Sequence, residues 1–298
     1  MATVDLSQLP QPQIIQVLDF ETILSEVKAV MLAAFPQEQQ ASVAAALELE
    51  SEPLNVIAQV VAYREMMLKQ RINDGAAACM LSHAVSTDLD NLAGNLDTKR
   101  LVITPETATT DAVTESDTAL RLRAQAAFEG LSVAGPTGAY EYFAKSASGN
   151  VADAKAISPS PAVVVVSVLS TEGNGTPSAE LLATVDKALS ADDKRPVADR
   201  LTVQAAKIVN YQINARLFFY PGPESEPIHA AAQDALQLWL KAQGRIGRDV
   251  ARSAIMAALH VQGVQRVELL KPASDIVIDD TQAARCESFT IETGGTDE

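Results

Sequence analysis

The chain has 298 residues, enough for two or three domains at about 100–200 residues each. Its hydrophobic fraction of 47% allows globular cores, and because aromatic residues make up only 4%, we expect these cores to be built from small aliphatic side chains. With 38 acidic and 23 basic residues the formal net charge is −15, which disfavours nucleic acid and anionic membranes as partners. The longest apolar runs are far shorter than the roughly 20 residues that cross a bilayer. The polar start "MATVDLSQLPQPQ" is unlike a secretion signal.

The N-terminal third is predicted to be helical. Residues 1–18 contain two prolines and are predicted to form an extended arm. The stretch 20–35 has apolar residues at helical spacing and is ended by Pro36. A second helix is expected to begin with Ser51 as its N-cap and to end at the Asn-Asp-Gly break over 73–75, and another is expected over 76–96.

The second of these helices carries a narrow apolar seam, typical of a helix that packs against another helix. The seam residues are Leu54, Ile57, Val61 and Leu68. Trp239 is the one tryptophan of the chain and is predicted to lie in a core or a protein interface. We therefore take these five residues as candidates for contact with a partner protein.

The middle of the chain alternates helices and strands after a Thr-rich stretch, 101–116, which is predicted to be an extended connector. A helix is expected to begin near Ser116 or Asp117 as its cap. The continuous valine run predicts a strand covered on both faces. The expected elements are helices over 116–130 and 135–148, strands over 151–158 and 162–170, and a helix within 171–190.

The last third begins with a half-buried strand, since alternate residues over 210–220 are apolar. The inward-facing set is Tyr211, Ile213, Ala215, Leu217 and Phe219. After a break over 221–227, the expected elements are a helix over 228–243, a helix begun by Asp249, and strands over 264–270 and 285–293. This order forms a compact β-α-α-β-β unit.

Taken together, the elements predict a multidomain α+β chain. We expect a helical N-terminal region over 1–100, a mixed α/β middle domain over 101–208, and a small β-α-α-β-β C-terminal domain over 209–298.

No motif with a catalytic mechanism is present: the sequence has no Walker phosphate loop, GxGxxG, GxSxG or HExxH. The three histidines are isolated, and the two cysteines form no CxxC pair. Asp88 and Asp90 are two positions apart on an expected helix, so their side chains point in different directions and do not chelate a metal ion together. We therefore assign no catalytic, cofactor-binding or metal-binding residue.

The stretch "RPVADRLTV", residues 195–203, places Arg195, Asp199 and Arg200 around a proline. A phosphate clamp favours arginines without competing acids, and catalysis needs a nucleophile, metal or cofactor nearby. Acidic residues surround the arginines here. We therefore interpret these three residues as a structural brace, with guanidinium groups fixing a turn through paired contacts.

Several blocks of the sequence resemble the baseplate J-like proteins of contractile phage tails and R-type pyocins. These blocks include "ESDTALRLRAQAAFEGLSVAGPTGAYEYFAKSASGNVADAKAISPSPAVVVVSVLS", "RPVADRLTVQAA", "PGPESEPIHAAA" and "GRDVARSAIMAALHVQGVQRVEL". "DLSQLPQPQ" and "LDNLAGNLDTKRL" extend the resemblance over nearly the whole chain, and the connector over 104–116 matches least.

The resemblance implies a baseplate wedge protein without an enzymatic site. Paired copies would join a smaller wedge protein through N-terminal helices, and neighbouring copies would meet through the C-terminal domain in a six-fold ring. That ring would surround the tail hub and the lysozyme-like sheath-initiator protein, and would transmit the trigger for sheath contraction. Assembly in the bacterial cytoplasm, into a virion or tail-like particle, is also implied. The alternative that the sequence leaves open is a tail-associated cell-wall hydrolase, which would need two positioned carboxylates in a cleft.

Overall fold

The structure is a computed structural model, and it describes residues 6, 9–10, 18–132, 134–222 and 225–296. The extended arm expected over 1–18 lies outside the described residues except for positions 6, 9, 10 and 18. The chain divides into two compact units, Met1–Asn95 and Leu96–Glu298. The multidomain α+β class expected from the sequence is confirmed.

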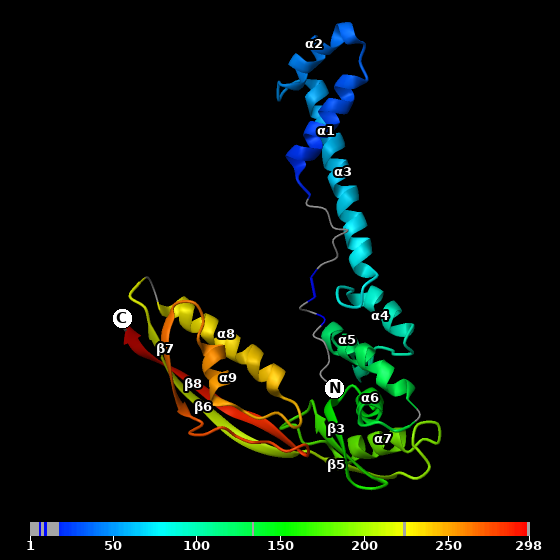
Figure 1. Cartoon of the computed structure of the whole chain (residues 1–298), viewed down its shortest axis with the longest axis vertical. Coiled ribbons are helices and arrows are strands. Elements are labelled where there is room, and N and C mark those ends of the chain that lie inside the picture. The colour runs from blue at the N-terminus through cyan, green and yellow to red at the C-terminus, as the bar shows by residue number, and fades with distance from the viewer. Residues whose placement is uncertain (1–5, 7–8, 11–17, 133, 223–224, 297–298) are drawn as a thin grey trace. The chain divides into compact units, whose positions relative to one another are not determined.

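The first unit is built from four helices in the part of the chain that the structure describes. They are α1 (Phe20–Ala33), α2 (Gln37–Leu47), α3 (Pro53–Ala78) and α4 (Ser86–Gly94). Figure 1 shows α1 beside the N-terminal half of α3. Asp19 caps α1 by accepting a hydrogen bond from the Thr22 backbone N–H. Apolar residues of α1, α2 and α3 form one core: Ile23, Leu24, Val27, Leu47, Ala58 and Ala62.

Two expectations about α3 are wrong. Its N-cap is Glu52 rather than Ser51, and Pro53 occupies the first turn, where its missing N–H costs nothing. The helix also continues through the Asn-Asp-Gly sequence to Ala78. The side chain of Asn73 is buried there, and a single glycine costs a helix only about 1 kcal/mol.

The neighbouring helices α2 and α4 also differ from expectation. No helix was expected over Gln37–Leu47. Helix α2 buries only Leu47, so its sequence shows almost no apolar periodicity that could have indicated a helix. Of the helix expected over 76–96, the first three residues belong to α3 and Ser86–Gly94 form α4, with turns and irregular backbone between them.

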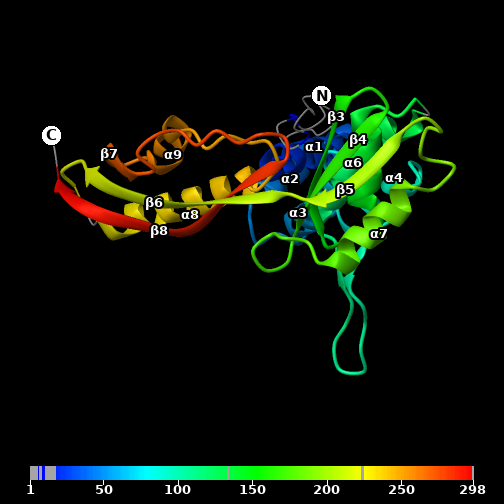
Figure 2. The same cartoon turned by 90° about the horizontal axis from the view of Figure 1, so that it is seen from below.

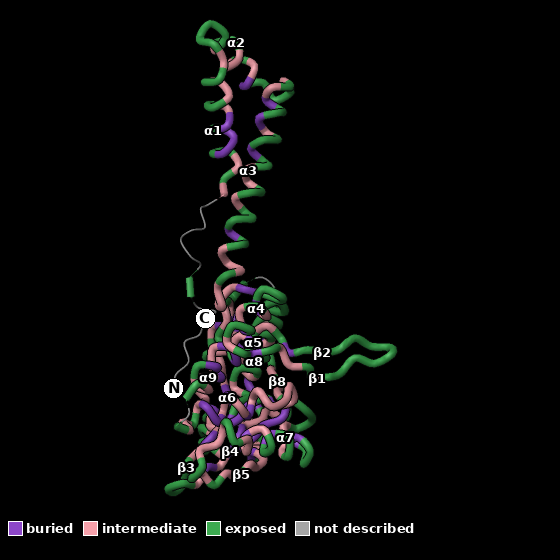
Figure 3. Tube along the Cα trace, turned by 90° about the vertical axis from the view of Figure 1, so that its right-hand side faces the viewer, coloured by how far each residue is buried: buried purple, intermediate pink, exposed green. Residues whose placement is uncertain are grey.

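The second unit begins with a hairpin where an extended connector was expected. Strands β1 (Val102–Thr104) and β2 (Val113–Thr114) pair antiparallel. Near the hairpin tip the Thr107 backbone N–H donates to the Thr110 carbonyl at 2.9 Å. Figure 3 shows the hairpin as an exposed arm projecting from its own unit. The threonine-rich composition indicated an extended backbone. It could not indicate that the two strands pair, because they are very short and exposed and their sequence has no apolar alternation.

A three-stranded sheet of order β3-β4-β5 forms the centre of this unit, and we call it the central sheet. Strands β3 (Val151–Ser160) and β4 (Val163–Ser170) are antiparallel, and β4 is parallel to β5 (Arg200–Ala205). The valine run lies in β4, the middle strand, where Val166 and Val168 are fully buried. The expected strands over 151–158 and 162–170 are confirmed.

Helices α6 (Thr137–Ala147) and α7 (Ala179–Leu189) cover the central sheet. Helix α5 (Asp117–Ala126) and the short 3-10 helix η2 (Ala127–Leu131) pack against α6. The expected cap is confirmed, because the Ser116 side chain accepts from the Ala119 backbone N–H. Helix α7 connects the parallel strands β4 and β5, as such a crossover requires, and it packs Leu181, Val185 and Leu189 onto the sheet.

The β-α-α-β-β unit is confirmed at the C-terminal end. Its elements are β6 (Lys207–Phe219), α8 (Ser225–Gln243), α9 (Arg252–Leu259), β7 (Val264–Lys271) and β8 (Gln282–Thr296). The strand order is β7-β6-β8, and we call it the C-terminal sheet. All five alternating residues predicted to face inward on β6 are buried, and they pack with α8 and α9 (Figure 2).

Two helix starts differ from expectation in this unit. Helix α8 begins at Ser225, before the predicted break ends, because Pro227 is tolerated in a first turn. Helix α9 has Ala251 as its N-cap. Asp249 does not begin α9, and its carboxylate accepts from the Ile278 backbone N–H at 2.7 Å.

The central and C-terminal sheets meet at a short junction. Strand β5 ends at Ala205 and β6 begins at Lys207, so one residue, Ala206, separates them. A small apolar cluster covers this point: Leu169, Ala206, Ile246 and Ala283, with Ile208 packed against them.

Candidate interaction surface

The exposed part of α3 is largely apolar. Ala58 and Ala62 are fully buried in the core shared with α1, and large exposed apolar residues are spread around about half of the helix circumference. The exposed members are Val56, Ile57, Val60, Val61, Tyr63, Met67, Leu68 and Ile72, each 44–65% exposed. We call this set the α3 apolar face. A contiguous exposed apolar surface of this kind is typical of a protein–protein contact.

The seam predicted from the sequence is divided by the structure. Ile57, Val61 and Leu68 belong to the α3 apolar face, whereas Leu54 packs against the core shared with α1. Trp239 lies in α8 and packs against the core of the C-terminal sheet. Because Trp239 is only partly buried, its role in an interface stays a prediction.

Sequence reasoning missed more than half of the α3 apolar face. The steps between positions 56, 60, 63 and 67 alternate between four and three residues, which is the heptad signal of a helix-packing stripe. That signal could have identified four of the residues that were missed, Val56, Val60, Tyr63 and Met67, whereas Ile72 lies outside the series.

The predicted brace makes its side-chain contact through Asp199. The Tyr140 hydroxyl donates to Asp199 Oδ2 at 2.7 Å, and this contact ties α6 to the turn before β5. The guanidinium groups of Arg195 and Arg200 form no ion pair within 4.0 Å among the described residues. The bracing role of the two arginines therefore stays a proposal.

Gly135 allows the brace turn to approach α6 closely. Its φ is +69°, in the region that favours glycine. A Cβ at this position would lie 2.6 Å from Pro196 Cγ and 3.2 Å from Asp199 Oδ2. A side chain here would therefore displace the turn that holds Asp199.

The recess beside this turn contains no space that a water molecule could occupy. It is lined by Gly135, Ala139, Tyr140, Phe143, Leu189 and Lys194. Its walls are mostly apolar, and Tyr140 and Lys194 are its polar members. The recess therefore has the character of packed structure rather than of a substrate pocket.

The contact with Asp199 makes stability sensitive to alkaline pH. Burial and then the hydrogen bond to Asp199 raise the pKa of Tyr140 above its ordinary value of 10.0. The unfolded phenol therefore loses its proton first, so the stabilisation is complete below pH 10 and is lost as the pH rises through the folded pKa. We expect the free energy of unfolding to fall more steeply above pH 10 in the wild type than in Tyr140→Phe, by up to about 1.4 kcal/mol per pH unit.

Urea titrations at a series of pH values between neutrality and pH 11 measure this difference. Tyr220→Phe is the matched control, because the Tyr220 side chain is 56% exposed, and this variant should keep the wild-type slope. Parallel slopes for the wild type and Tyr140→Phe would contradict the prediction.

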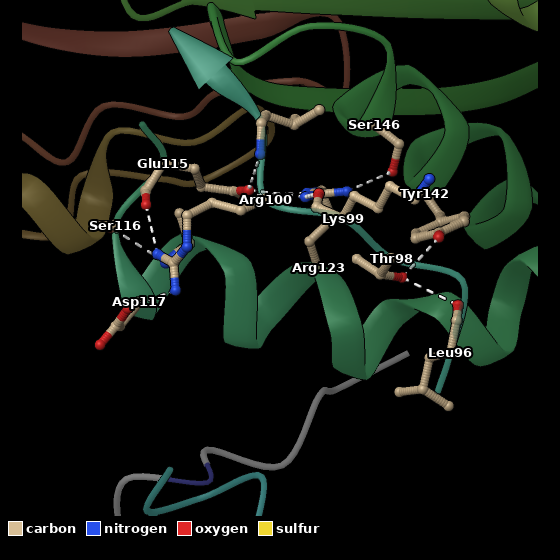
Figure 4. Close-up of polar contacts among 12 residues, drawn as sticks. Leu96, Thr98, Lys99, Arg100, Glu115, Ser116, Asp117, Arg123, Tyr142 and Ser146 are labelled. Carbon is tan, nitrogen blue, oxygen red and sulfur yellow. Dashed lines mark hydrogen bonds and ion pairs between the residues drawn. The ribbon is translucent and has the colours of Figure 1, made fainter. Parts of the chain in front are cut away.

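A buried ion network fixes the base of the β1–β2 hairpin (Figure 4). Arg123 on α5 is 6% exposed and donates to both carboxylate oxygens of Glu115, at 3.0 Å from Nε and 2.7 Å from Nη2. Its Nη2 also donates to the Lys99 carbonyl. The Glu115 carboxylate in turn accepts from the Leu101 backbone N–H at 3.2 Å. Both ends of the hairpin are therefore attached to α5 by one guanidinium.

A second arginine strengthens the same attachment. Arg100 Nη1 donates to the Glu115 carbonyl at 2.6 Å, and its Nη2 lies 2.7 Å from Asp117 Oδ1. The sequence did not predict the ion pairs of these two arginines. In the sequence, Arg123 is part of an ordinary amphipathic helix, and Glu115 lies just before that helix begins.

A buried carboxylate joins the central sheet to the C-terminal sheet. Asp153 on β3 is 7% exposed. Its Oδ1 lies 2.7 Å from Lys145 Nζ on α6, and its Oδ2 accepts from the Ile246 backbone N–H at 2.9 Å. Asp153 was also missed, because its partner Ile246 is 93 positions away in the sequence.

Metal sites and membrane-spanning helices are both absent from the described residues. No group of three or more His, Cys, Asp or Glu side chains is placed to hold a metal ion there. Within the same ranges, none of the helices has the length and apolar character needed to cross a membrane.

Comparisons with known proteins match almost all parts of the fold. Family models for the baseplate J-like N-terminal, central and C-terminal domains match residues 50–107, 132–205 and 211–292. The chain is also 55% identical over 302 residues to "Baseplate protein J" of Escherichia phage P2, with all of both chains covered. The first of these domains includes α3 with its exposed apolar face, and the other two correspond to the central and C-terminal sheets. The chain therefore belongs to the baseplate J-like family.

Proposed function

We propose that the chain is a structural wedge subunit in the baseplate of a contractile tail, either of a phage or of an R-type pyocin. The observation that carries this proposal is the α3 apolar face, because eight exposed large apolar residues on one helix need a protein partner. Membership of the baseplate J-like family and the P2 relative named as a baseplate protein support the same role.

In this proposal, pairs of copies join a smaller wedge protein through the α3 apolar face. Neighbouring copies meet through the C-terminal sheet and close a six-fold ring around the tail hub and the lysozyme-like sheath-initiator protein. The ring transmits the trigger for sheath contraction. Assembly takes place in the bacterial cytoplasm, and the finished subunit resides in the virion or tail-like particle.

Three domains carry these tasks: 1–100, 101–208 and 209–298. The separate family models for the N-terminal, central and C-terminal domains support this division. Within Leu96–Glu298, the single residue between β5 and β6 supports a boundary near position 206.

A structural role is favoured over the alternative of a cell-wall hydrolase. Glycoside hydrolysis commonly uses two carboxyl groups that flank the scissile bond. The recess beside Tyr140 is next to one carboxylate, Asp199, and that carboxylate accepts the hydrogen bond from Tyr140. We therefore propose no catalytic residue and no cofactor.

Replacing Ile57 with aspartate tests the assembly role of α3. The side chain is 55% exposed, so the change should leave the first unit folded but place a carboxylate within an apolar contact. We expect at least a tenfold loss of the complex with the smaller wedge protein and a corresponding loss of assembled baseplates, since a buried unpaired charge costs several kcal/mol. Co-expression followed by affinity purification and electron microscopy of particles measures both.

Ala41→Asp is the matched control, because Ala41 is an exposed residue of α2 in the same unit and lies off the α3 apolar face. It introduces the same charge and should assemble normally. Normal particles from Ile57→Asp, with a folded C-terminal sheet in both variants, would refute the proposed role of this surface.

A further inference from the structure

One stretch of strand passes from the central sheet into the C-terminal sheet with a single residue between its two parts. Strand β5 pairs with β4 as far as Ala205, and β6 pairs with β8 from Lys207 onward. Ala206, the residue between them, donates its backbone N–H to the Val168 carbonyl at 2.9 Å. The next backbone N–H, that of Lys207, donates to the Thr281 carbonyl at 3.0 Å. Figure 2 shows β6 following directly from β5, so backbone hydrogen bonding is continuous from one sheet to the other.

The turn between α8 and α9 holds the two sheets together from outside this strand. Its Ile246 N–H donates to Asp153 Oδ2 on β3 at 2.9 Å, and Ile246 also forms an antiparallel bridge with Ala283 on β8. The adjacent Gly247 N–H donates to the Gln282 carbonyl at 2.9 Å. Since β3 and β8 are edge strands, the turn is bound to the edge of each sheet.

A bend of the chain at Ala206 would break these contacts together. It would separate the N–H groups of Ala206 and Lys207 from their carbonyls and would open the apolar cluster at the junction. The buried members of that cluster are only 2–7% exposed: Leu169, Ala206, Ile246 and Ala283. Hinge residues absorb large changes in φ and ψ, and segments that open locally have exposed hydrogen bonds and few buried apolar contacts. The junction has the opposite properties.

We propose that the central and C-terminal sheets move as one rigid body when the subunit changes conformation, although they belong to separate domains. A displacement of either sheet is then passed to the other without a bend at Ala206. This inference rests on the proposed function, in which the ring transmits the trigger for sheath contraction. It adds that the signal crosses residues 101–298 through a rigid junction.

A distance between the two sheets tests the proposal. Spin labels are attached in Lys187→Cys/Lys241→Cys, because these exposed residues lie on α7 and α8, and Cys79 and Cys286 are replaced by alanine. Labelled copies are diluted with unlabelled ones, so that only distances within one copy are measured. Double electron–electron resonance should give one narrow distribution. Its maximum should be the same in the free protein, in assembled baseplates before contraction and in baseplates after contraction.

The matched control is a label pair within one helix. Glu226→Cys/Lys241→Cys places both labels on α8, about 22 Å apart along the helix axis, and gives the width of a distribution that contains no bend. The pair across the junction should be of similar width. Two maxima in the free protein, or a maximum that shifts on contraction while the α8 pair does not, would overturn the proposal.

A variant with a deliberate hinge tests whether transmission needs this rigidity. Two glycines inserted after Ala206 interrupt the strand, and we expect particles that contract about tenfold more slowly on contact with susceptible cells, counted by electron microscopy. Two glycines inserted after Asp193 lengthen an exposed turn of the same unit and should leave contraction unchanged. Asp153→Ala removes a single contact, so it should broaden the distance distribution and slow contraction less than the insertion does.

The outcomes separate this inference from the proposed function. If the insertion variant assembles and contracts like the wild type, the rigid junction is overturned and the wedge role stands. If the insertion prevents assembly, the wild-type distances decide, because they need no change at the junction. A chain that does not enter baseplates would remove the proposed function itself, whereas the distances in the free protein would still test whether the two sheets form one body.

Discussion

Arg123→Ala is expected to lower the free energy of unfolding of the second unit by about 3–5 kcal/mol, which is typical when one partner of a buried ion pair is removed. Glu115 would remain behind with a carboxylate whose side chain is only 8% exposed. The Lys99 carbonyl and the Ser146 hydroxyl would also lose the hydrogen bonds that the guanidinium donates. The loss is therefore much larger than that of a surface ion pair, which contributes about 0–1 kcal/mol.

Urea denaturation with two optical probes measures this loss. Circular dichroism reports helices of the whole chain, whereas the fluorescence of the single tryptophan, Trp239, reports the core of the C-terminal sheet. Lys187→Ala, which removes an exposed charge from α7, is the control and should change stability by less than about 0.5 kcal/mol. A change of similar size in Arg123→Ala would contradict a stabilising role for the network.

Two more variants identify the origin of the effect. Arg123→Lys keeps the charge but cannot donate to both oxygens of Glu115 and to Lys99 at once, so it should recover only part of the stability. Arg123→Leu combined with Glu115→Leu removes both buried charges and should be less destabilised than the sum of the single changes. Hydrogen exchange of the β1–β2 hairpin should increase in Arg123→Ala, because both of its ends depend on this guanidinium.

The parts of the fold that were predictable are those with a strong local pattern. Alternation in β6 identified its five buried residues because a strand with one covered face must have a period of two. The β4 valines identified a central strand, and Ser116 identified the start of α5, since a hydroxyl before an amphipathic run satisfies an otherwise unpaired backbone N–H.

The elements that were missed lack such a pattern. Helix α2 is rich in alanine and glutamine and buries one residue, so its position depends on contact with α1 and α3. The Asn-Asp-Gly sequence near the end of α3 indicates a break in isolation. Burial of Asn73 shows that the tertiary environment overrides this local preference.

The candidate interaction residues were predictable only in part for a similar reason. Spacing along α3 indicated an apolar stripe, but it could not tell which members face α1. Leu54 packs inward, while Ile57 and Leu68 are exposed. Contacts between distant positions, such as Arg123 with Lys99 or Asp153 with Ile246, have no local signature at all, since each residue is unremarkable among its sequence neighbours.

Asp153→Ala is expected to loosen the C-terminal sheet from the central sheet. The chain connects the two sheets through Ala206, and Asp153 adds a second connection by accepting from the Ile246 backbone N–H. Without the carboxylate this N–H is buried and unpaired, which costs about 1–3 kcal/mol. The ion pair with Lys145 adds less, because the lysine side chain is 33% exposed and solvent screens it. We therefore expect a loss of about 2–3 kcal/mol in coupling between the sheets.

Unfolding followed by Trp239 fluorescence should separate from the transition seen by circular dichroism in Asp153→Ala, whereas the two should coincide more closely in the wild type. Distances between spin labels on exposed positions of α7 and α8 should also broaden. Asp153→Asn keeps an oxygen that accepts from Ile246 and should lose only about 1 kcal/mol. Asp186→Ala removes an exposed carboxylate of α7 and serves as the control. Equal behaviour of Asp153→Ala and Asp186→Ala would show that Ala206 and the apolar cluster around it are sufficient to hold the sheets together.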